Sequence, residues 1–194
     1  PVVKRAQLMF KFKAILEEHL DELTFMVSRE LGKNLDEAAG DVLKSIEAVE
    51  LASAVPITMQ GDSLMNVSNG IDTVMYREPV GVFLGIVPFN FPAMIPFGWM
   101  IPLAITTGNT FVLKASSQTP MTAVRILELL YQVGLPKGVV NLVTCSRNEA
   151  ETLLSHPDIN GISYVGSTRT GRHIFATAAQ YGKRVQVLGE AKNH

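Results

Sequence analysis

The feature that most constrains this chain is a long segment without a charged residue, which runs from Pro79 to Leu113. Its length would permit a membrane-spanning helix. Prolines interrupt it, however, and each one breaks the helical hydrogen bonding that a membrane span requires; they lie at Pro79, Pro88, Pro92, Pro96 and Pro102. We therefore expect no membrane partner. The segment predicts instead a strand covered on both faces, which is typically apolar throughout, then a proline-rich turn and a buried helix.

From Val80 onward, short apolar runs alternate with helical patterns, and this alternation predicts the fold class. The expected strands cover residues 80–87, 110–113, 139–143, 161–165 and 184–188. The expected helices cover residues 93–106, 119–133, 148–154 and 168–180, with Thr119 as the N-cap of the second. Strands and helices in this order predict an α/β fold, Rossmann-like, in which helices flank both faces of a five-stranded parallel sheet.

The first part of the chain has a helical pattern. Apolar residues recur at helical spacing from Leu8 to Val27, and Gly32 suits the end of that helix. A second helix is expected from about residue 36 to residue 54, with a proline at 56 ending it. Two N-terminal helices are therefore expected to precede the sheet. The residues of the second helix that are expected to face inward are Val42, Leu43, Ile46 and Val49.

A polar segment joins the two parts. Within it, Asp72 to Tyr76 is expected to form either an edge strand or part of a hairpin. Residues 1–194 are expected to form a single, partial dinucleotide-binding domain. Its helical part covers 1–57, its linker with the edge strand 58–79, and its α/β part 80–194.

Composition limits the function classes. The formal net charge is −1 and no cluster of lysine and arginine is present, so nucleic acid is not expected as a partner. Cys145 is the only cysteine, which excludes an internal disulfide framework, and the histidines lack ligand spacing, so no metal site is expected. The first residues lack the pattern of a secretory signal. These features agree with a cytoplasmic location, with a mitochondrial one open if a targeting segment precedes residue 1.

Candidate site residues follow the expected strands, because the ligands of an open parallel sheet bind beyond the carboxyl ends of its strands. Asn90 follows the first strand, inside a turn of aromatic and proline residues. Its amide has two interpretations. It either bonds the backbone of that turn, since a buried amide needs partners, or points into a site as a donor to an oxyanion.

Other positions also have a functional and a structural interpretation. Lys114 ends the second strand and either bonds a ribose or phosphate or extends along the sheet rim into solvent. Gly166 and Ser167 open a helix after the fourth strand, where free N–H groups suit a phosphate; the alternative is a tight turn with Ser167 as N-cap. No glycine-rich dinucleotide motif follows the first strand. Cys145 is expected to be a small core residue rather than a nucleophile.

Taken together, several motifs resemble the aldehyde dehydrogenase superfamily in their order and spacing. The most specific are residues 88–92 (Pro-Phe-Asn-Phe-Pro), 110–114, 134–139 and 165–168. Residues 88–96 and 191–194 (Ala-Lys-Asn-His) resemble the methylmalonate-semialdehyde dehydrogenase branch, which makes an acyl-CoA. The resemblance implies oxidation of a small semialdehyde through a thioacyl-enzyme, with NAD or NADP as cofactor and CoA as acyl acceptor. It also implies a homodimer or homotetramer.

The resemblance implies residue roles as well. Asn90 matches the asparagine that donates to the oxyanion. The implied cofactor-binding residues are Ile86, Pro88, Phe89, Lys114, Ser116, Ser117, Gly166 and Ser167. Ile86, Pro88 and Phe89 match the wall of the cofactor cleft. The segment with Lys114, Ser116 and Ser117 matches the one at the adenosine ribose, and Gly166 with Ser167 matches the turn at the pyrophosphate. The nucleophilic cysteine of the family is expected beyond residue 194, so the catalytic domain is expected to be absent and the chain alone inactive.

Four departures from the family pattern bear on specificity. Ser117 stands where many NAD-using members carry a glutamate that bonds the ribose 2′-hydroxyl, and its neutral side chain would admit a 2′-phosphate. Leu188 stands where hydrolytic members carry a water-activating glutamate, which favours CoA. Glu190 stands where the family usually has a glycine, and it is the alternative candidate for the base that activates water. Lys44 stands where an arginine binds the substrate carboxylate, and lysine offers no bidentate fork.

Two alternative functions remain open. One is a hydrolytic, NADP-linked succinate-semialdehyde dehydrogenase. The other belongs to a different class and is a non-catalytic nucleotide-binding fragment.

Overall fold

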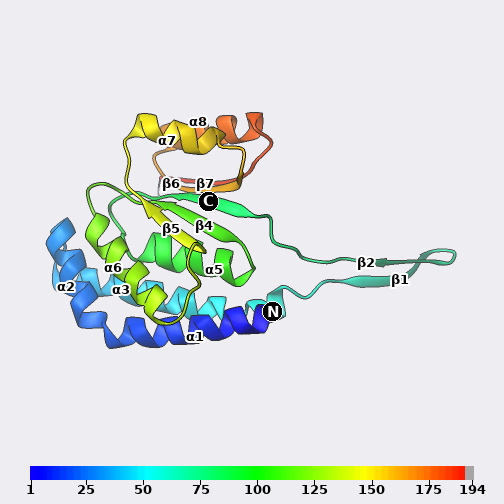
Figure 1. Ribbon diagram of the computed structural model, residues 1–194, viewed down its shortest axis with the longest axis horizontal. Coiled ribbons are helices and arrows are strands. Elements are labelled where there is room, and N and C mark those ends of the chain that lie inside the picture. Colours follow the sequence, from blue (N-terminus) through cyan, green and yellow to red (C-terminus); the bar gives the residue numbers. More distant parts are fainter. Residues whose placement is uncertain (191–194) are drawn as a thin grey trace.

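The computed structural model describes residues 1–190 of the chain (Figure 1). Its centre is a five-stranded sheet in the order β5-β4-β3-β6-β7, in which all neighbouring strands are parallel. The strands are β3 (Val82–Ile86), β4 (Thr110–Lys114), β5 (Val140–Val143), β6 (Ile159–Gly166) and β7 (Arg184–Gly189). The expected α/β fold and its strands are confirmed, with ends that differ by at most two residues.

The direction of strand addition reverses once in this sheet. From β3 the chain moves outward to β4 and β5, and it then crosses back to place β6 on the other side of β3. The connections that follow β3 and β6 therefore run to opposite sides and open a crevice at the carboxyl ends of these strands. Such a switch point is where open α/β sheets bind their ligands.

Helices cover both faces of the sheet (Figure 1). α7 (Arg147–Ser155) and α8 (Thr168–Gln180) lie on one face, and α5 (Ile101–Thr106) and α6 (Pro120–Gln132) lie with the N-terminal helices on the other. Each face has its own apolar core. The larger core, on the side of the N-terminal helices, includes Phe12, Phe97 and Phe111. The smaller core, on the side of α7 and α8, includes Leu84, Ile162 and Ile174.

The N-terminal part has four helices within residues 1–58 rather than two. They are α1 (Val2–Glu18), α2 (Leu20–Leu31), α3 (Leu35–Ala52) and α4 (Val55–Thr58). The prediction of one helix across residues 8–27 was wrong, because the chain turns at His19 (φ −100°, ψ 18°). The imidazole of His19 contacts Glu22 in the first turn of α2 (Nδ1 to Oε2 2.6 Å). Neither proline nor glycine marks this break, and the apolar spacing continues through it.

The end of α2 and the inward face of α3 largely follow the sequence pattern. Gly32 ends α2 in the left-handed conformation (φ 78°), as expected. Val42, Ile46 and Val49 are buried, as expected, whereas Leu43 is 44% exposed and the prediction for it was wrong. Consecutive residues of an α-helix point about 100° apart, so Leu43 lies beside the buried stripe rather than on it.

The uncharged segment folds into a strand, a turn and a buried helix, but the helix has two parts. It begins as the π-helical segment η1 (Ile95–Met100) and continues as α5. Pro102 lacks the N–H that regular α-helical bonding requires, and the wider turn directly precedes it. Gly98 lets η1 approach α3, since a Cβ there would lie 3.2 Å from Ser45 Cα. No helix within residues 1–190 is long and apolar enough to cross a membrane.

A hairpin projects from the body of the molecule (Figure 1). Its strands, β1 (Ser63–Ser68) and β2 (Ile71–Val74), are antiparallel, and all their side chains are exposed. Of the two expectations for this segment, the hairpin is confirmed. Its ends meet at the base, where Met75 N donates to Asp62 O (2.8 Å).

Candidate functional site

A cavity of about 600 Å³ lies at the switch point between β3 and β6. Its walls are mainly apolar, and three of its residues carry polar side chains, namely Asn90, Ser167 and Glu190. Apolar walls with a few polar groups are typical of a small-molecule site. The residues that line the cavity are Pro88, Phe89, Asn90, Phe91, Met94, Ile95, Trp99, Val165, Gly166, Ser167, Leu188 and Glu190.

The cavity brings together only part of the predicted site. Pro88, Phe89 and Asn90 come from the turn after β3, and Gly166 and Ser167 come from the turn between β6 and α8. These two turns are far apart in the sequence and meet because parallel strands end at one edge of the sheet. The predicted residues that do not line the cavity are Lys44, Ile86, Lys114, Ser116 and Ser117.

The side chain of Asn90 is exposed at the cavity. The expectation of a buried amide was therefore wrong. No hydrogen bond joins this side chain to another residue in the range 1–190. Its N–H is thus available to an oxygen atom that enters the cavity, which agrees with the interpretation as an oxyanion donor.

Groups outside the turn hold the backbone on both sides of Asn90. The hydroxyl of Thr119 donates to Phe89 O (3.2 Å). On the other side, Met94 N donates to the carboxylate of Asp41 (Oδ1, 2.8 Å). The direction of the Asn90 side chain therefore depends on contacts with α3 and with the start of α6.

Thr119 is the N-cap residue of α6, as expected, but its side chain makes no capping hydrogen bond. The carboxylate of Glu30, near the end of α2, takes that role and accepts from Met121 N (2.6 Å) and Thr122 N (2.9 Å). A carboxylate suits this place because it complements the free N–H groups and the dipole of the helix. The hydroxyl of Thr119 is left to bind the turn that carries Asn90.

Sequence reasoning missed a buried ion pair behind the turn. Asp41 is 2% exposed, and burial raises the pKa of its carboxyl, although the hydrogen bond from Met94 N and the charge of Lys33 act to lower it. Lys33 Nζ lies 3.7 Å from Asp41 Oδ2 and 3.8 Å from the centre of the Phe91 ring. An acidic residue next to Val42 on the inward stripe of a helix was a signal that could have found this pair.

A second group of predicted residues lies at the end of the neighbouring strand. Lys114 pairs in register with Ile86, and its side chain is half-buried. Beyond it, Ser116 Oγ accepts from Gln118 N (3.2 Å), and Ser117 is exposed. This group therefore lies on the same edge of the sheet as the cavity, one strand away from Asn90.

The turn from β6 into α8 requires glycine at its first position. A Cβ on Gly166 would lie 2.3 Å from Tyr164 Oη, whose hydroxyl donates to Ser167 O (3.1 Å). The hydroxyl of Ser167 accepts from Thr170 N (3.4 Å), so the interpretation of Ser167 as an N-cap is confirmed. Because Gly166 and Ser167 line the cavity, α8 begins at its wall.

Glu190 brings a negative charge to the start of α8. Its Oε1 accepts from Thr168 N (3.3 Å), and its backbone N donates to Gly166 O (2.8 Å). The φ of Glu190 is 62°, a left-handed conformation that favours glycine. The carboxylate therefore occupies the N-terminal turn of α8 at the edge of the cavity.

Lys44 and Cys145 lie apart from the cavity lining. Lys44 is exposed on α3 and pairs with Glu47 (Nζ to Oε2 2.6 Å). Cys145 follows β5 and is only partly buried, so the expectation of a core cysteine was wrong. Within residues 1–190, no group of His, Cys, Asp and Glu is placed to hold a metal ion. The Ala-Lys-Asn-His motif at 191–194 lies outside the described residues.

Comparison with known proteins gives one family. The model described as the aldehyde dehydrogenase family matches residues 1–194. The chain is 50% identical to malonate-semialdehyde dehydrogenase 2 of Geobacillus kaustophilus and 48% identical to malonate-semialdehyde dehydrogenase of Bacillus cytotoxicus. Each alignment covers 100% of this chain, which spans 40% of the length of those relatives.

Solved structures show the same similarity. A methylmalonate-semialdehyde dehydrogenase from Oceanimonas doudoroffii has a TM-score of 0.95 and 44% identity, with coverage of 100% of this chain and 40% of that chain. A Sinorhizobium meliloti 1021 structure, described as a candidate methylmalonate-semialdehyde dehydrogenase complexed with NAD, has a TM-score of 0.95 and 41% identity. That match covers 100% of this chain and 39% of the other.

Proposed function

Because the chain belongs to the aldehyde dehydrogenase family, we propose that it forms the dinucleotide-binding domain of an NAD(P)-dependent dehydrogenase of malonate or methylmalonate semialdehyde. The resemblance to this family and to its methylmalonate-semialdehyde dehydrogenase branch is confirmed. The observation that carries the functional proposal is the Asn90 side chain, exposed at a cavity on the switch point of the sheet.

In the proposed reaction, the carbonyl oxygen of the aldehyde lies next to the amide of Asn90. A thiolate attacks the carbonyl carbon, an electron pair moves to the oxygen, and the Asn90 N–H donates to the oxyanion. When bound, the nicotinamide ring would supply the acceptor for the hydride that leaves the tetrahedral carbon. The electron pair of the oxyanion would then re-form the carbonyl, so that a thioester would remain. The thiolate is proposed to come from outside these residues, because Cys145 is the only cysteine and does not line the cavity.

The cofactor is proposed to run along the carboxyl edge of the sheet. Its nicotinamide end would lie at the cavity, against Pro88 and Phe89, which line it. Ile86, at the end of β3, would continue this wall outside the cavity lining. The pyrophosphate would lie at Gly166 and Ser167, since a helix N-terminus attracts phosphate. The adenosine ribose would lie at the end of β4, near Lys114, Ser116 and Ser117. In support, the Sinorhizobium meliloti neighbour holds NAD.

The oxyanion role of Asn90 is tested by Asn90→Ala in the enzyme that contains this domain. The expected result is a fall in kcat with malonate semialdehyde of about 10²- to 10³-fold, as for loss of an oxyanion donor, without loss of NAD(P) affinity. The matched control is Asn148→Ala, which removes the same amide from an exposed position on α7 outside the cavity lining. An unchanged kcat in Asn90→Ala refutes the proposed role. Dinucleotide binding without any turnover would favour the non-catalytic alternative.

The cofactor preference is tested at Ser117. Its side chain lies beyond the end of β4 and is exposed and neutral, so it leaves room for a 2′-phosphate and carries no charge that would repel one. Ser117→Glu is expected to weaken NADP binding selectively, because the new carboxylate repels the 2′-phosphate and can bond a free 2′-hydroxyl. Titration of NAD and of NADP into wild type and into Ser117→Glu measures the four affinities that this comparison needs. An equal loss for NAD and NADP would show that Ser117 does not face the ribose.

The proposed acyl acceptor is CoA. Leu188 lines the cavity. By the family resemblance it stands where hydrolytic members carry a water-activating glutamate, and leucine provides no carboxylate there. Glu190 also lines the cavity and is the observation that favours the hydrolytic alternative. Assays of malonate and succinate semialdehyde with and without CoA separate the two. Formation of the free acid at full rate without CoA would favour the NADP-linked hydrolytic enzyme.

Lys44 is proposed to attract the substrate carboxylate. Lys44 is exposed and paired with Glu47. To attract the substrate carboxylate, it must therefore either release Glu47 or act at longer range. Lys44→Met is therefore expected to raise KM for malonate semialdehyde and to leave KM for propanal, which lacks a carboxylate, unchanged. A parallel rise for both aldehydes would exclude this role.

We also propose a cytoplasmic homodimer or homotetramer with a small-molecule aldehyde as substrate. The relatives named above are bacterial, which gives no support to the mitochondrial alternative. The observation that supports this proposal is the exposed hairpin, whose side chains are open to a second copy of the chain.

A further inference from the structure

We propose that Asp41 and Lys33 are positioning residues that hold the Asn90 amide in its direction toward the cavity. The inference rests on the proposed role of Asn90 as oxyanion donor. Neither side chain lines the cavity, so both would act through the backbone and the ring that flank Asn90.

Asp41 holds the chain on the far side of the turn. It lies on α3, and its Oδ1 accepts a hydrogen bond from Met94 N (2.8 Å), the N-cap residue of η1. This carboxylate caps the start of the helix that follows Asn90, where free N–H groups favour a negative charge. Movement of Asp41 would therefore move the first turn of η1 and the Asn90 turn joined to it.

Lys33 holds the residue next to Asn90. Its ammonium lies over the Phe91 ring, 3.8 Å from the ring centre, a distance at which a cation is attracted to the aromatic face. The same ammonium lies 3.7 Å from Asp41 Oδ2. A single ion pair therefore contacts the turn at two places, Phe91 and Met94, while Asn90 stays exposed between them.

The pair is poorly explained by stability alone. Within residues 1–190, neither Asp41 Oδ2 nor Lys33 Nζ has a hydrogen-bond partner, although both atoms are buried. Buried ion pairs with unsatisfied atoms add little to stability compared with apolar residues of the same size. Glu30 provides a contrast, since both of its oxygens accept hydrogen bonds at the start of α6. A role in holding the Asn90 turn accounts for the pair, because a functional group needs supporting contacts that keep it in the productive geometry.

The test is a double-mutant cycle between Asp41→Asn and Asn90→Ala in the complete enzyme. If Asp41 acts through Asn90, Asp41→Asn lowers kcat by about tenfold, which is part of the roughly 10²-fold loss that a misplacement of about 1 Å can cause. KM for NAD(P) stays unchanged. In the Asn90→Ala background, Asp41→Asn causes no further loss, since the group that it positions is already gone.

Two further variants keep the test decisive. Lys33→Met is expected to show the same loss and the same non-additivity, and it serves if Asp41→Asn does not fold. Lys183→Met is the matched control. Lys183 is also a buried lysine, but its Nζ donates to His156 O and Ile159 O at the amino end of β6, opposite the cavity. This control is expected to lower the melting temperature and to leave kcat unchanged in both backgrounds.

The outcomes separate this inference from the proposed function. If Asn90→Ala lowers kcat and Asp41→Asn either has no effect or reduces kcat equally in both backgrounds, the positioning role is overturned and the role of Asn90 stands. If Asn90→Ala leaves kcat unchanged, the proposed role of Asn90 itself fails.

Discussion

At the scale of single residues, Glu190 is the side chain least compatible with the proposed cofactor position. Its φ of 62° suits glycine, and its carboxylate accepts from Thr168 N at the start of α8. The N-terminal turn of α8 therefore already holds an anion where the pyrophosphate is proposed to bind. Gly166 and Ser167 keep the helix start open to the cavity, and Glu190 reduces its attraction for phosphate.

Glu190→Gly is expected to tighten NAD(P) binding. The change removes the negative charge and relaxes the left-handed residue, so the phosphate meets the helix dipole without a competitor. A gain of about two- to fivefold in affinity is expected for one charge at a helix N-terminus. Fluorescence titration measures it, with Glu190→Gln as a control that removes the charge and keeps the backbone conformation. Unchanged or weaker binding in both variants would show that the carboxylate does not compete with phosphate.

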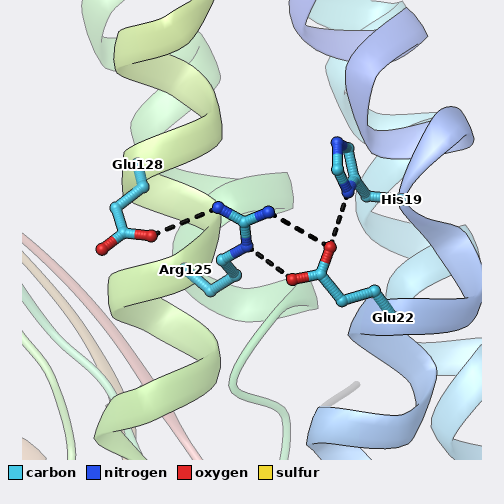
Figure 2. A network of polar contacts seen from close by, with 4 residues as sticks. All are labelled: His19, Glu22, Arg125 and Glu128. Atoms are coloured by element: carbon cyan, nitrogen blue, oxygen red, sulfur yellow. Dashed lines mark hydrogen bonds and ion pairs between the residues drawn. The ribbon is translucent and has the colours of Figure 1, made fainter.

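At the scale of elements, an ionic network joins α2 to α6 (Figure 2). The guanidinium of Arg125 donates to both oxygens of Glu22 (2.6 and 3.2 Å) and to Glu128 (3.3 Å). His19, at the break between α1 and α2, contacts the same Glu22 carboxylate. The network thus fixes α6 against the N-terminal layer, and the start of α6 in turn carries the Thr119 hydroxyl that holds the Asn90 turn.

The stability that Glu22 contributes is expected to depend on pH. Its hydrogen bonds with Arg125 hold the pKa of Glu22 below its ordinary value of 4.5. The contribution is therefore fully present above that value and is lost as the pH falls through the lower pKa of the folded state. Glu22→Gln is expected to lower the free energy of unfolding at neutral pH by about 0.2–1 kcal/mol, since both side chains are partly exposed.

Denaturant unfolding of wild type and Glu22→Gln from neutral to acid pH measures this. The difference between the two proteins should shrink as Glu22 becomes protonated. Glu128→Gln, which loses a single longer hydrogen bond to Arg125, is the control and should have a smaller effect. A difference that stays constant with pH would mean that ionisation of Glu22 contributes nothing.

The positions of helices and strands were predictable wherever a local sequence pattern determines them. Apolar runs bounded by turn residues gave the strands, and Gly32 gave the end of α2. The break at His19 was not predictable, because no helix-breaking residue marks it. The caps that Glu30 and Asp41 provide were missed for another reason: each joins residues far apart in the sequence, and side-chain spacing within one helix does not reveal such partners.

At the scale of the whole molecule, the site follows from the topology. Asn90 and Gly166 could be assigned to one edge of the sheet, because parallel strands end there. That they share a cavity, while Lys114 lies outside its lining, depends on the order of the strands: β3 contacts both β4 and β6, and only the β3–β6 side is the switch point. Local periodicity contains no information on this order.

The hairpin is the part of the molecule that the rest of the fold does not explain. An isolated two-stranded hairpin is at most marginally stable in water. This one exposes apolar side chains, which points to a covering partner; they are Leu64, Met65, Val67, Ile71 and Val74. Since the proposed enzyme is a homo-oligomer, a second copy of the chain is the expected cover.

Removal of the hairpin is therefore expected to change assembly and to spare the site. Because Met75 N already bonds Asp62 O, a short Gly-Ser link can replace residues 63–74 without moving β3. The particle mass by light scattering should fall to that of a smaller assembly, while NAD(P) affinity stays unchanged, since no hairpin residue lines the cavity. Leu64→Lys with Val74→Lys, which keeps the hairpin and charges its surface, should have the same effect. An unchanged mass in both variants would assign assembly to another surface, and lost affinity would show that the hairpin supports the sheet itself.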